Sequence, residues 1–134
     1  MAAVDTDAWL AAWNDPGARP KIELSDPEVE VHAVTLGIEG RHYKGYDGLR
    51  QWMRDVRDRF GARTVAEAID VLGDDALLIR GTVYMNDRFG GEQQQSFAIV
   101  VHLRDGKARW LGTFFSAADA KAAYASGVTG PGPG

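Results

Sequence analysis

Four strand-like segments joined by short turns occupy the chain between Arg63 and Phe115, and they constrain its fold more than any other feature. The segments read RTVAEAIDVL, ALLIRGTVYMN, EQQQSFAIVVHLR and KARWLGTFF, and the turns read GDD, DRFGG and DG. Glycine and aspartate in such short links are typical of hairpins, and Asp105-Gly106 is the clearest case. Because links this short leave no room for a crossover, neighbouring strands must run antiparallel. The sequence therefore predicts a meander of four strands.

Helical patterns lie on both sides of the meander. Residues 46–60 repeat apolar side chains every three or four positions, which predicts one amphipathic helix. Shorter helices are predicted within residues 5–14 and 116–125, each with a capping side chain at its start. Residues 28–34 alternate in polarity and predict a further strand. This order of elements predicts an α+β fold in which a curved sheet wraps over helices.

The length of the chain suits one domain. Its 134 residues are enough for a single core with room for a cavity. We assign residues 1–125 to this domain. The end of the chain, residues 126–134, reads SGVTGPGPG and is expected to be disordered.

Composition excludes several classes of function. The formal net charge of −4 argues against a nucleic-acid partner. Arginines do gather between Arg50 and Arg63, but aspartates alternate with them, so we interpret them as a solvated helix face. The absence of cysteine excludes disulfides and thiolate chemistry. No apolar run reaches the roughly 20 residues that span a bilayer, and the start of the chain does not resemble a signal peptide, so we expect a cytoplasmic protein with no membrane partner.

A single histidine, His32, interrupts the strand predicted at residues 28–34. The odd positions up to Ala33 are apolar, whereas the two glutamates and His32 occupy even positions. The apolar row must be the buried one, because the opposite register would bury both glutamates. His32 is therefore expected on the outer face. A bulge that shifts the parity by one residue would make it a catalytic candidate instead.

Glu67 lies in an otherwise apolar row of the strand at residues 63–72. A simple register counted from the GDD turn places it beside Gly81, and a glycine opposite a carboxylate leaves space next to it. Glu67 is therefore a candidate general base whose pKa would be raised by its apolar surroundings. The structural alternative is an exposed carboxylate paired with Arg80 or Arg63.

The last hairpin predicts a hollow on the same face. Counting from its two-residue turn places Trp110 opposite Val101, Gly112 opposite Ile99, and Phe114 opposite Phe97, on an apolar face with a glycine at its centre. Two glycines ringed by aromatic side chains are typical of a pocket for a small ligand. The alternative is that the glycines mark bends and the tryptophans fill the core.

Four segments together resemble a known family. VEVHAV, YKGYDGLRQWM, FAIVVHLRDGKARW and FFSAADAKAA are similar to the SnoaL-like branch of the nuclear transport factor two-like superfamily, which includes ketosteroid isomerases, scytalone dehydratase and limonene epoxide hydrolase. The resemblance covers most of residues 7–125, and YKGYDGLR and LRDGK are its most specific parts. It implies a cone-shaped barrel, a pocket between the helices and the concave sheet, and frequently a homodimer.

The catalytic residues of this family are not matched here. In the ketosteroid isomerase pattern, the general-base aspartate falls at Ala33 and the oxyanion-hole aspartic acid falls near Ile99. In the epoxide hydrolase pattern, Arg80 is kept but Thr82 stands where an aspartate belongs. An oxyanion hole needs donors aimed at the developing charge, and alanine and isoleucine supply none.

Three functions remain open. The first is a cofactor-independent isomerase, cyclase or dehydratase with Glu67 as base and His32 in reserve. The second is a ligand-binding module without catalysis, and the third is a dimerising scaffold. No cofactor is expected, and the three histidines show no metal-ligand spacing. The expected partners are a small hydrophobic molecule and a second copy of the chain. The residues expected to line the ligand site are Trp13, Tyr43, Trp52, Val56, Gly81, Ile99, Trp110, Gly112 and Phe114.

Overall fold

The computed structural model describes residues 4–32, 42–60, 63–86 and 89–130. Within them the elements are α1 (Thr6–Asn14), α2 (Arg19–Glu23), β1 (Ser25–His32), β2 (His42–Lys44), α3 (Gly45–Phe60), β3 (Arg63–Gly73), β4 (Ala76–Asn86), β5 (Glu92–Arg104), β6 (Lys107–Phe114) and α4 (Ala117–Ala125). The predicted α+β class is confirmed, with four helices and one curved sheet in the described part of the chain.

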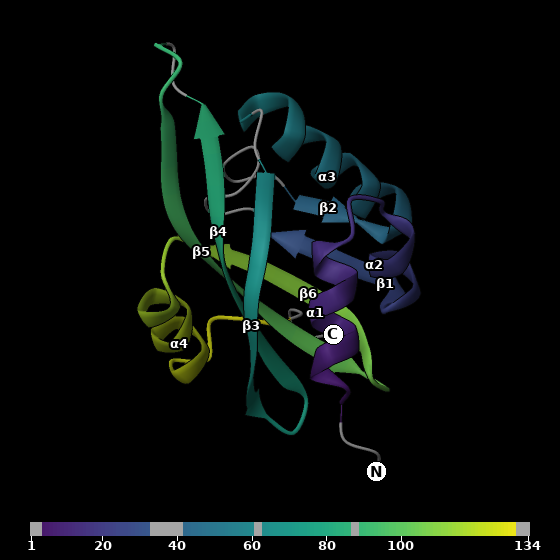
Figure 1. Ribbon diagram of the computed structural model, residues 1–134. Helices are drawn as coiled ribbons and strands as arrows, with labels where there is room; N and C mark the ends of the chain where they lie inside the picture. The colour runs from purple at the N-terminus through teal and green to yellow at the C-terminus, as the bar shows by residue number, and fades with distance from the viewer. Residues whose placement is uncertain (1–3, 33–41, 61–62, 87–88, 131–134) are drawn as a thin grey trace.

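The described strands form a single sheet in the order β2-β1-β6-β5-β4-β3 (Figure 1). Strands β3 to β6 are paired antiparallel in sequence order, which confirms the predicted meander. Strand β1 pairs in parallel with β6 and antiparallel with β2. Helices α1 and α3 pack on one face of the sheet, called here the concave face, and α4 packs on the other, the convex face.

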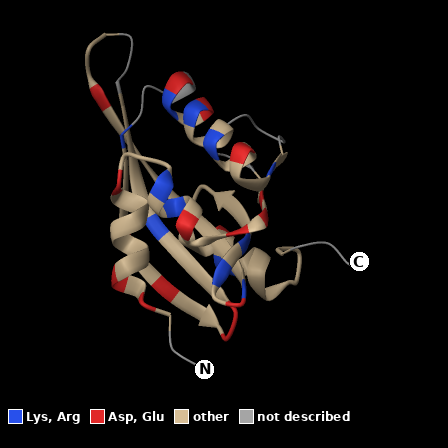
Figure 2. Ribbon diagram, turned by 90° about the vertical axis from the view of Figure 1, so that its right-hand side faces the viewer, with Lys and Arg blue, Asp and Glu red and all other residues tan. Residues whose placement is uncertain are grey.

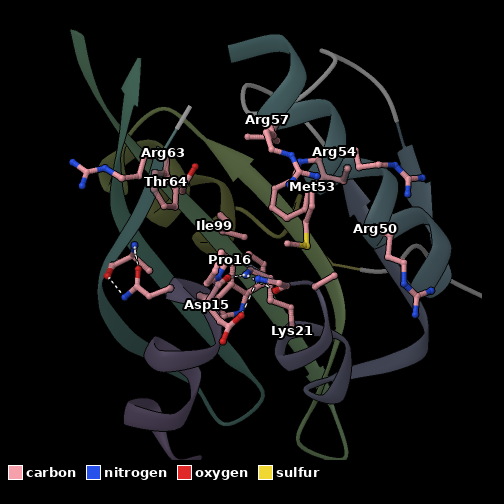
Figure 3. Close-up of a pocket in the computed structure, with 18 residues that line it drawn as sticks. Asp15, Pro16, Lys21, Arg50, Met53, Arg54, Arg57, Arg63, Thr64 and Ile99 are labelled. Atoms are coloured by element: carbon pink, nitrogen blue, oxygen red, sulfur yellow. Dashed lines mark hydrogen bonds between the residues drawn. The ribbon is translucent and has the colours of Figure 1, made fainter. Parts of the chain in front are cut away.

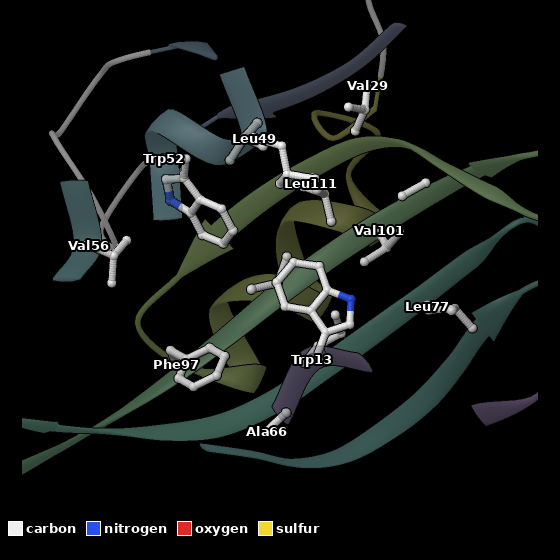
Figure 4. Close-up of a cluster of buried hydrophobic side chains, with 14 of the residues drawn as sticks. Trp13, Val29, Leu49, Trp52, Val56, Ala66, Leu77, Phe97, Val101 and Leu111 are labelled. Carbon is white, nitrogen blue, oxygen red and sulfur yellow. The ribbon is translucent and has the colours of Figure 1, made fainter. Parts of the chain in front are cut away.

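The main core lies between the concave face and helices α1 and α3. Helix α3 buries Leu49, Trp52 and Val56, and α1 buries Trp9 and Trp13, because each helix carries its large apolar side chains on one stripe. Figure 4 shows Trp13 and the three α3 residues facing apolar side chains from β1, β3, β4, β5 and β6. The strand residues of this cluster are Val29, Val31, Tyr43, Ala66, Leu77, Ile79, Val83, Phe97, Ile99, Val101, Ala108 and Leu111.

Strand β1 has the predicted parity. Val29 and Val31 are 0% and 1% exposed, whereas Glu30 and His32 lie on the other face and are half-buried. Ala33 and Val34 lie outside the described residues. The outward position predicted for His32 is therefore confirmed.

A bulge in β6 overturns the register predicted for the last hairpin. Leu103 pairs with Ala108 as the two-residue turn requires, but His102 pairs with Trp110, so Arg109 is an extra residue. One extra residue moves every later side chain to the opposite face. Leu111 is consequently buried in the concave core, and Trp110 belongs to the convex cluster.

A second bulge, in β3, removes Glu67 from its predicted place. Ile69 pairs with Ile79 as expected, but Ala66 rather than Glu67 pairs with Gly81, and Ala68 pairs with Arg80. Glu67 is therefore the extra residue of this bulge.

The two strand glycines do not leave the predicted hollow, because aromatic rings cover them. A Cβ added at Gly81 would lie 2.6 Å from two ring carbons of Phe97, and one added at Gly112 would lie 2.6 Å from Cζ3 of Trp110. Each glycine thus lets a neighbouring ring lie flat on the backbone, as close packing in a sheet requires. The expectation that Gly81 and Gly112 open a space is wrong.

The C-terminal part of the chain covers the convex face. Ser116 caps α4 by accepting from the Asp119 backbone N–H at 3.1 Å, as predicted. Beyond the helix, Thr129 Oγ1 lies 2.8 Å from His102 Nε2, so the segment expected to be disordered contacts the sheet as far as it is described. Residues 131–134 lie outside the described residues.

Candidate functional site

A cavity of about 910 Å³ lies between α1, α3 and the concave face of the sheet. Its apolar wall combines side chains from the two helices with side chains from β3 and β5. The loop that joins α1 to α2 closes one side (Figure 3). The apolar lining residues are Trp13, Pro16, Ala18, Trp52, Met53, Val56, Ala66, Phe97 and Ile99. A wall of this kind favours a small molecule with apolar rings.

Two tryptophans form the aromatic part of this wall. The ring centroids of Trp13 and Trp52 are 5.9 Å apart and their planes are inclined by 58°. Both side chains are 8% exposed or less, so packing fixes their positions. Tilted aromatic pairs at this separation attract one another beyond the area that they bury. The wall is therefore preformed.

Helix α1 is fastened to the edge strand β3 by Asn14. Its side-chain amide donates to the Ala66 carbonyl, and its Oδ1 accepts from the Ala66 backbone N–H, each at 2.8 Å. Strand β3 is at the edge of the sheet, so its backbone groups at the bulge have no strand partner on that side. The Asn14 side chain takes the place of a neighbouring strand and holds Trp13 at the cavity.

A buried lysine closes the end of the cavity near α2. Lys21 is 6% exposed, and its Nζ donates to the carbonyl of Asp15 at 2.8 Å and lies 5.6 Å from the centroid of Trp13. Burial lowers the pKa of Lys21, while the nearby Asp15 carboxylate raises it. The ammonium therefore both fixes the α1–α2 loop and supplies positive charge at the wall.

Three arginines of α3 line one side of the opening, and we call Arg50, Arg54 and Arg57 the cationic rim. Arg63, at the start of β3, also borders the cavity, but its guanidinium lies over the ring of Tyr84 on the convex face (Figure 3). Spacings of four and three residues put the three helical arginines on one face of α3, next to the stripe that enters the core. They are exposed, as predicted, but they line the cavity rather than a featureless solvated face.

Four of the predicted ligand-site residues line the cavity. They are Trp13, Trp52, Val56 and Ile99. Tyr43 is not among the lining residues; it is buried, and its hydroxyl donates to Asp55 at 2.6 Å.

Four other residues that were predicted to line the ligand site do not line the cavity, because of the strand bulge and the glycine packing described above. The β6 bulge turns Trp110, Gly112 and Phe114 to the convex face, where Trp110 packs in the cluster beside α4. Gly81 does face the concave side, but the ring of Phe97 covers it. None of these four is among the described residues that line the cavity.

The predicted position of Glu67 is also wrong. Its side chain is exposed and accepts from Thr82 Oγ1 at 2.6 Å. The expected alternative partners are engaged elsewhere, since Arg80 pairs with Asp70 and Arg63 lies over the ring of Tyr84. Glu67 is therefore placed outside the cavity.

His32 lies in a row of rings on the convex face. Its ring centroid is 4.0 Å from that of His42 and 5.1 Å from that of Trp110. Burial lowers the pKa of His32, and His42 lowers it further. In the described residues no three metal-ligating side chains come together.

The cationic rim is the part of the site that sequence reasoning missed. The signal was the spacing of Arg50, Arg54 and Arg57, which places them between the apolar stripe of α3 and its aspartates. Alternating charges along the helix suggested a neutral solvated surface, and Figure 2 shows that alternation along α3. No pattern in the sequence indicates that Lys21 is part of the site, because its burial depends on how the α1–α2 loop folds over it.

Comparisons with known proteins identify the fold. No family model and no curated protein matches the sequence. Among solved structures, TerC co-crystallised with polyporic acid is 20% identical, with a TM-score of 0.67 over 87% of this chain and 94% of that one. An NTF2-like protein of unknown function from Burkholderia pseudomallei is 15% identical, with a TM-score of 0.66 over 85% and 89% of the two chains.

A third structure supports the same conclusion. A protein from Catenulispora acidiphila with a ketosteroid isomerase-like fold, in complex with trimethylamine, is 13% identical, with a TM-score of 0.63 over 83% of this chain and 84% of that one. The chain therefore has the cone fold shared by NTF2-like and ketosteroid isomerase-like proteins, as its resemblance implied. None of the helices described here is long and apolar enough to cross a bilayer.

Proposed function

We propose that this protein is a SnoaL-like small-molecule-binding protein whose concave cavity takes a hydrophobic ligand with aromatic rings. The main observation in support of this proposal is the cavity of about 910 Å³, whose wall includes Trp13, Trp52, Phe97 and Ile99. Ligand sites of roughly 300–1,000 Å³ hold molecules of drug size. A dimerising scaffold with a filled core, the third function considered above, would have a cavity volume below this range.

Solved structures with this fold support a ligand in the cavity but not a particular one. One of them is co-crystallised with polyporic acid and another is in complex with trimethylamine. The same fold thus accompanies an acid in one protein and an amine in the other. The residues at each site, rather than the fold, decide the ligand.

Binding without catalysis is the better supported of the two ligand-based functions. A general base must reach the reacting proton within a hydrogen bond. The candidates Glu67 and His32 both lie outside the cavity, and Asp15 is the one carboxylate among its described lining residues. Asp15 is exposed, and its Oδ1 accepts from the Gly17 backbone N–H at 2.8 Å. This leaves no buried carboxylate for the mechanism expected from the sequence.

An enzymatic function has one specific observation in its favour. Lys21 is buried in the cavity wall, and burial lowers its pKa, which is how a lysine amine becomes a usable base near neutral pH. A cofactor-independent isomerase or cyclase would then use Lys21 in place of Glu67. Turnover of steroid-like or aromatic polyketide substrates that is lost in Lys21→Met and kept in Glu67→Gln would establish this function.

A neutral fluorescent probe tests the binding proposal directly. N-phenyl-1-naphthylamine becomes bright in apolar surroundings, and we expect it to bind one site per chain. Met53→Trp fills the cavity and should weaken binding about tenfold or more. Val71→Trp adds the same side chain at a position that is 65% exposed and should leave binding unchanged. Absence of saturable binding, or equal loss in both variants, would contradict the proposal.

The homodimer implied by the resemblance forms a second part of the proposal. Light scattering coupled to gel filtration distinguishes the 14.6 kDa chain from a mass of twice that value. A monomer at all concentrations would remove the dimer from the proposal and leave the binding function intact.

A further inference from the structure

We propose that the cavity binds a hydrophobic aldehyde covalently, through an imine with the side-chain amine of Lys21. This inference rests on the proposed binding function, because the aldehyde must first occupy the cavity. It adds a reaction to that function and names the chemical class of the ligand. Figure 3 shows Lys21 beside Asp15 and Pro16, at the end of the cavity formed by the α1–α2 loop.

The first observation is the place of the amine relative to the aromatic wall. Lys21 lines the cavity, and its Nζ lies 5.6 Å from the ring centroid of Trp13. Trp13 is also the ring on which an aromatic ligand would pack. A carbonyl group at the edge of such a ligand would therefore lie within reach of the amine.

The second observation is that the buried ammonium lacks an opposite charge in contact with it. Lys21 is 6% exposed, and among the described residues it forms no ion pair with a carboxylate. Its hydrogen-bond partners are two neutral carbonyls, that of Asp15 at 2.8 Å and that of Gly17 at 3.5 Å. Buried charges in proteins are normally paired, so the charged form is stabilised less here than in a buried ion pair.

The neutral amine is the form that reacts with a carbonyl group. Burial lowers the pKa of Lys21, and this effect is larger than the opposite effect of the Asp15 carboxylate. A larger fraction of this lysine is therefore neutral than of an exposed one. Desolvation in an apolar pocket is a general way to make a lysine nucleophilic.

The reaction needs no further reactant. The nitrogen lone pair attacks the carbonyl carbon, the carbonyl π pair moves to oxygen, and a proton passes from nitrogen to that oxygen. The oxygen then takes a second proton and leaves as water while the nitrogen lone pair forms the C=N bond. In sum, the ammonium and the aldehyde give a protonated imine and one water molecule.

The contacts of Lys21 suit the product as well as the free side chain. A protonated imine keeps the positive charge and a single N–H. That N–H can still donate to the Asp15 carbonyl, which holds the shorter of the two hydrogen bonds, and only the 3.5 Å contact with Gly17 is lost. The apolar wall around the ligand keeps water from the imine and so slows its hydrolysis.

Reductive trapping with an aromatic aldehyde tests this inference on the unmodified protein. 2-Naphthaldehyde is the probe, and sodium cyanoborohydride delivers hydride to the imine carbon and makes the bond permanent. Peptide mass mapping then assigns each naphthylmethyl group to a lysine or to the α-amino group. The chain has four lysines, and Lys44, Lys107 and Lys121 are exposed.

The exposed lysines are internal controls. Below saturation, Lys21 should be labelled at least about tenfold more than any of them, because the bound aldehyde is held beside it. Labelling of Lys21 should saturate with aldehyde concentration, whereas labelling of exposed lysines should rise in proportion to it. N-phenyl-1-naphthylamine should compete at Lys21 alone.

Two variants that leave Lys21 in place make the test specific. Met53→Trp fills the cavity and should lower labelling of Lys21 about tenfold without changing that of the exposed lysines. Val71→Trp adds the same side chain at a position that is 65% exposed and should change neither.

The possible results separate the two proposals. If neither the neutral probe nor the aldehyde binds saturably, the binding function fails and the imine site fails with it. If the neutral probe binds but the exposed lysines are labelled as much as Lys21, the cavity stands and the imine site is wrong. If Lys21 is labelled equally in Met53→Trp, the reaction does not come from the cavity, and the site is again wrong. Saturable labelling of Lys21 that is lost only in Met53→Trp establishes the site.

Discussion

Replacing Asn14 by alanine tests whether one amide side chain holds the wall of the cavity. Its two hydrogen bonds to Ala66, each 2.8 Å long, join α1 to the bulged edge strand. Ala66 is only 4% exposed, so in Asn14→Ala its backbone N–H and carbonyl lose partners in a place that water reaches poorly. We expect a loss of both stability and ligand affinity, because Trp13 is adjacent on the same helix.

The magnitude follows from these contacts. An unsatisfied buried backbone group costs about 1–3 kcal/mol, and the exposure of Asn14 itself argues for the lower end. Two groups then lower the free energy of unfolding by about 2 kcal/mol. For 134 residues the entropy of unfolding near the midpoint is about 0.28 kcal/mol per kelvin, so Tm should fall by about 7 °C.

Thermal and urea unfolding measure this effect, and two further variants make it specific. Asn14→Asp keeps the acceptor for the Ala66 N–H but sets a carboxylate against the Ala66 carbonyl, so it should be no more stable than Asn14→Ala. Gln95→Ala, on an exposed part of β5, should stay within about 0.5 kcal/mol of the native protein. If Asn14→Ala also stays within that range, the amide does not hold α1, and the reasoning is refuted.

Three other predictions concern Glu67, Gly112 and the histidines of the convex face. Glu67→Gln should leave binding of the neutral probe within twofold, since Glu67 is placed outside the cavity; a larger loss in a fluorescence titration would contradict that placement. Gly112→Ala should cost about 1–3 kcal/mol in urea unfolding, because its Cβ would collide with the Trp110 ring. Burial lowers the pKa of both His32 and His102, so the folded state binds fewer protons than the unfolded one. Stability should therefore fall as pH drops below about 6.5, and His32→Gln should flatten that slope in unfolding curves.

Local patterns in the sequence were sufficient for the meander and for the inner face of β1. Turn residues fix hairpins, and alternation fixes faces, so the buried Val29 and Val31 and the outward His32 were predictable. The parallel pairing of β1 with β6 was not predictable from the sequence. The two strands are far apart along the chain, so no turn between them indicates that they are neighbours.

The site was predictable only where side chains follow a regular period. The stripe of α3 placed Trp52 and Val56 correctly at the cavity, since a helix keeps its period from end to end. Charges along the same helix were ambiguous, because a solvated face and the rim of a cavity have the same pattern until the neighbouring strand is in place. Arg57 can be recognised as a cavity residue only once the sheet lies opposite α3.

The bulge at Arg109 keeps two large aromatic rings of β6 off the concave face. Without the extra residue, Trp110 and Phe114 would project into the concave face from β6, opposite Val101 and Phe97, as the simple register expects. Two more rings would then have to pack on the concave face, where Leu111 lies instead. With the bulge, Trp110 packs against His102 and His32 on the convex face instead. Arg109 is held there by Glu30, 2.9 Å from its guanidinium, and by the carbonyl of Glu28 at 2.8 Å. The residue that breaks the strand pattern is thus anchored to β1, and this contact fixes the register that turns Trp110 to the convex face.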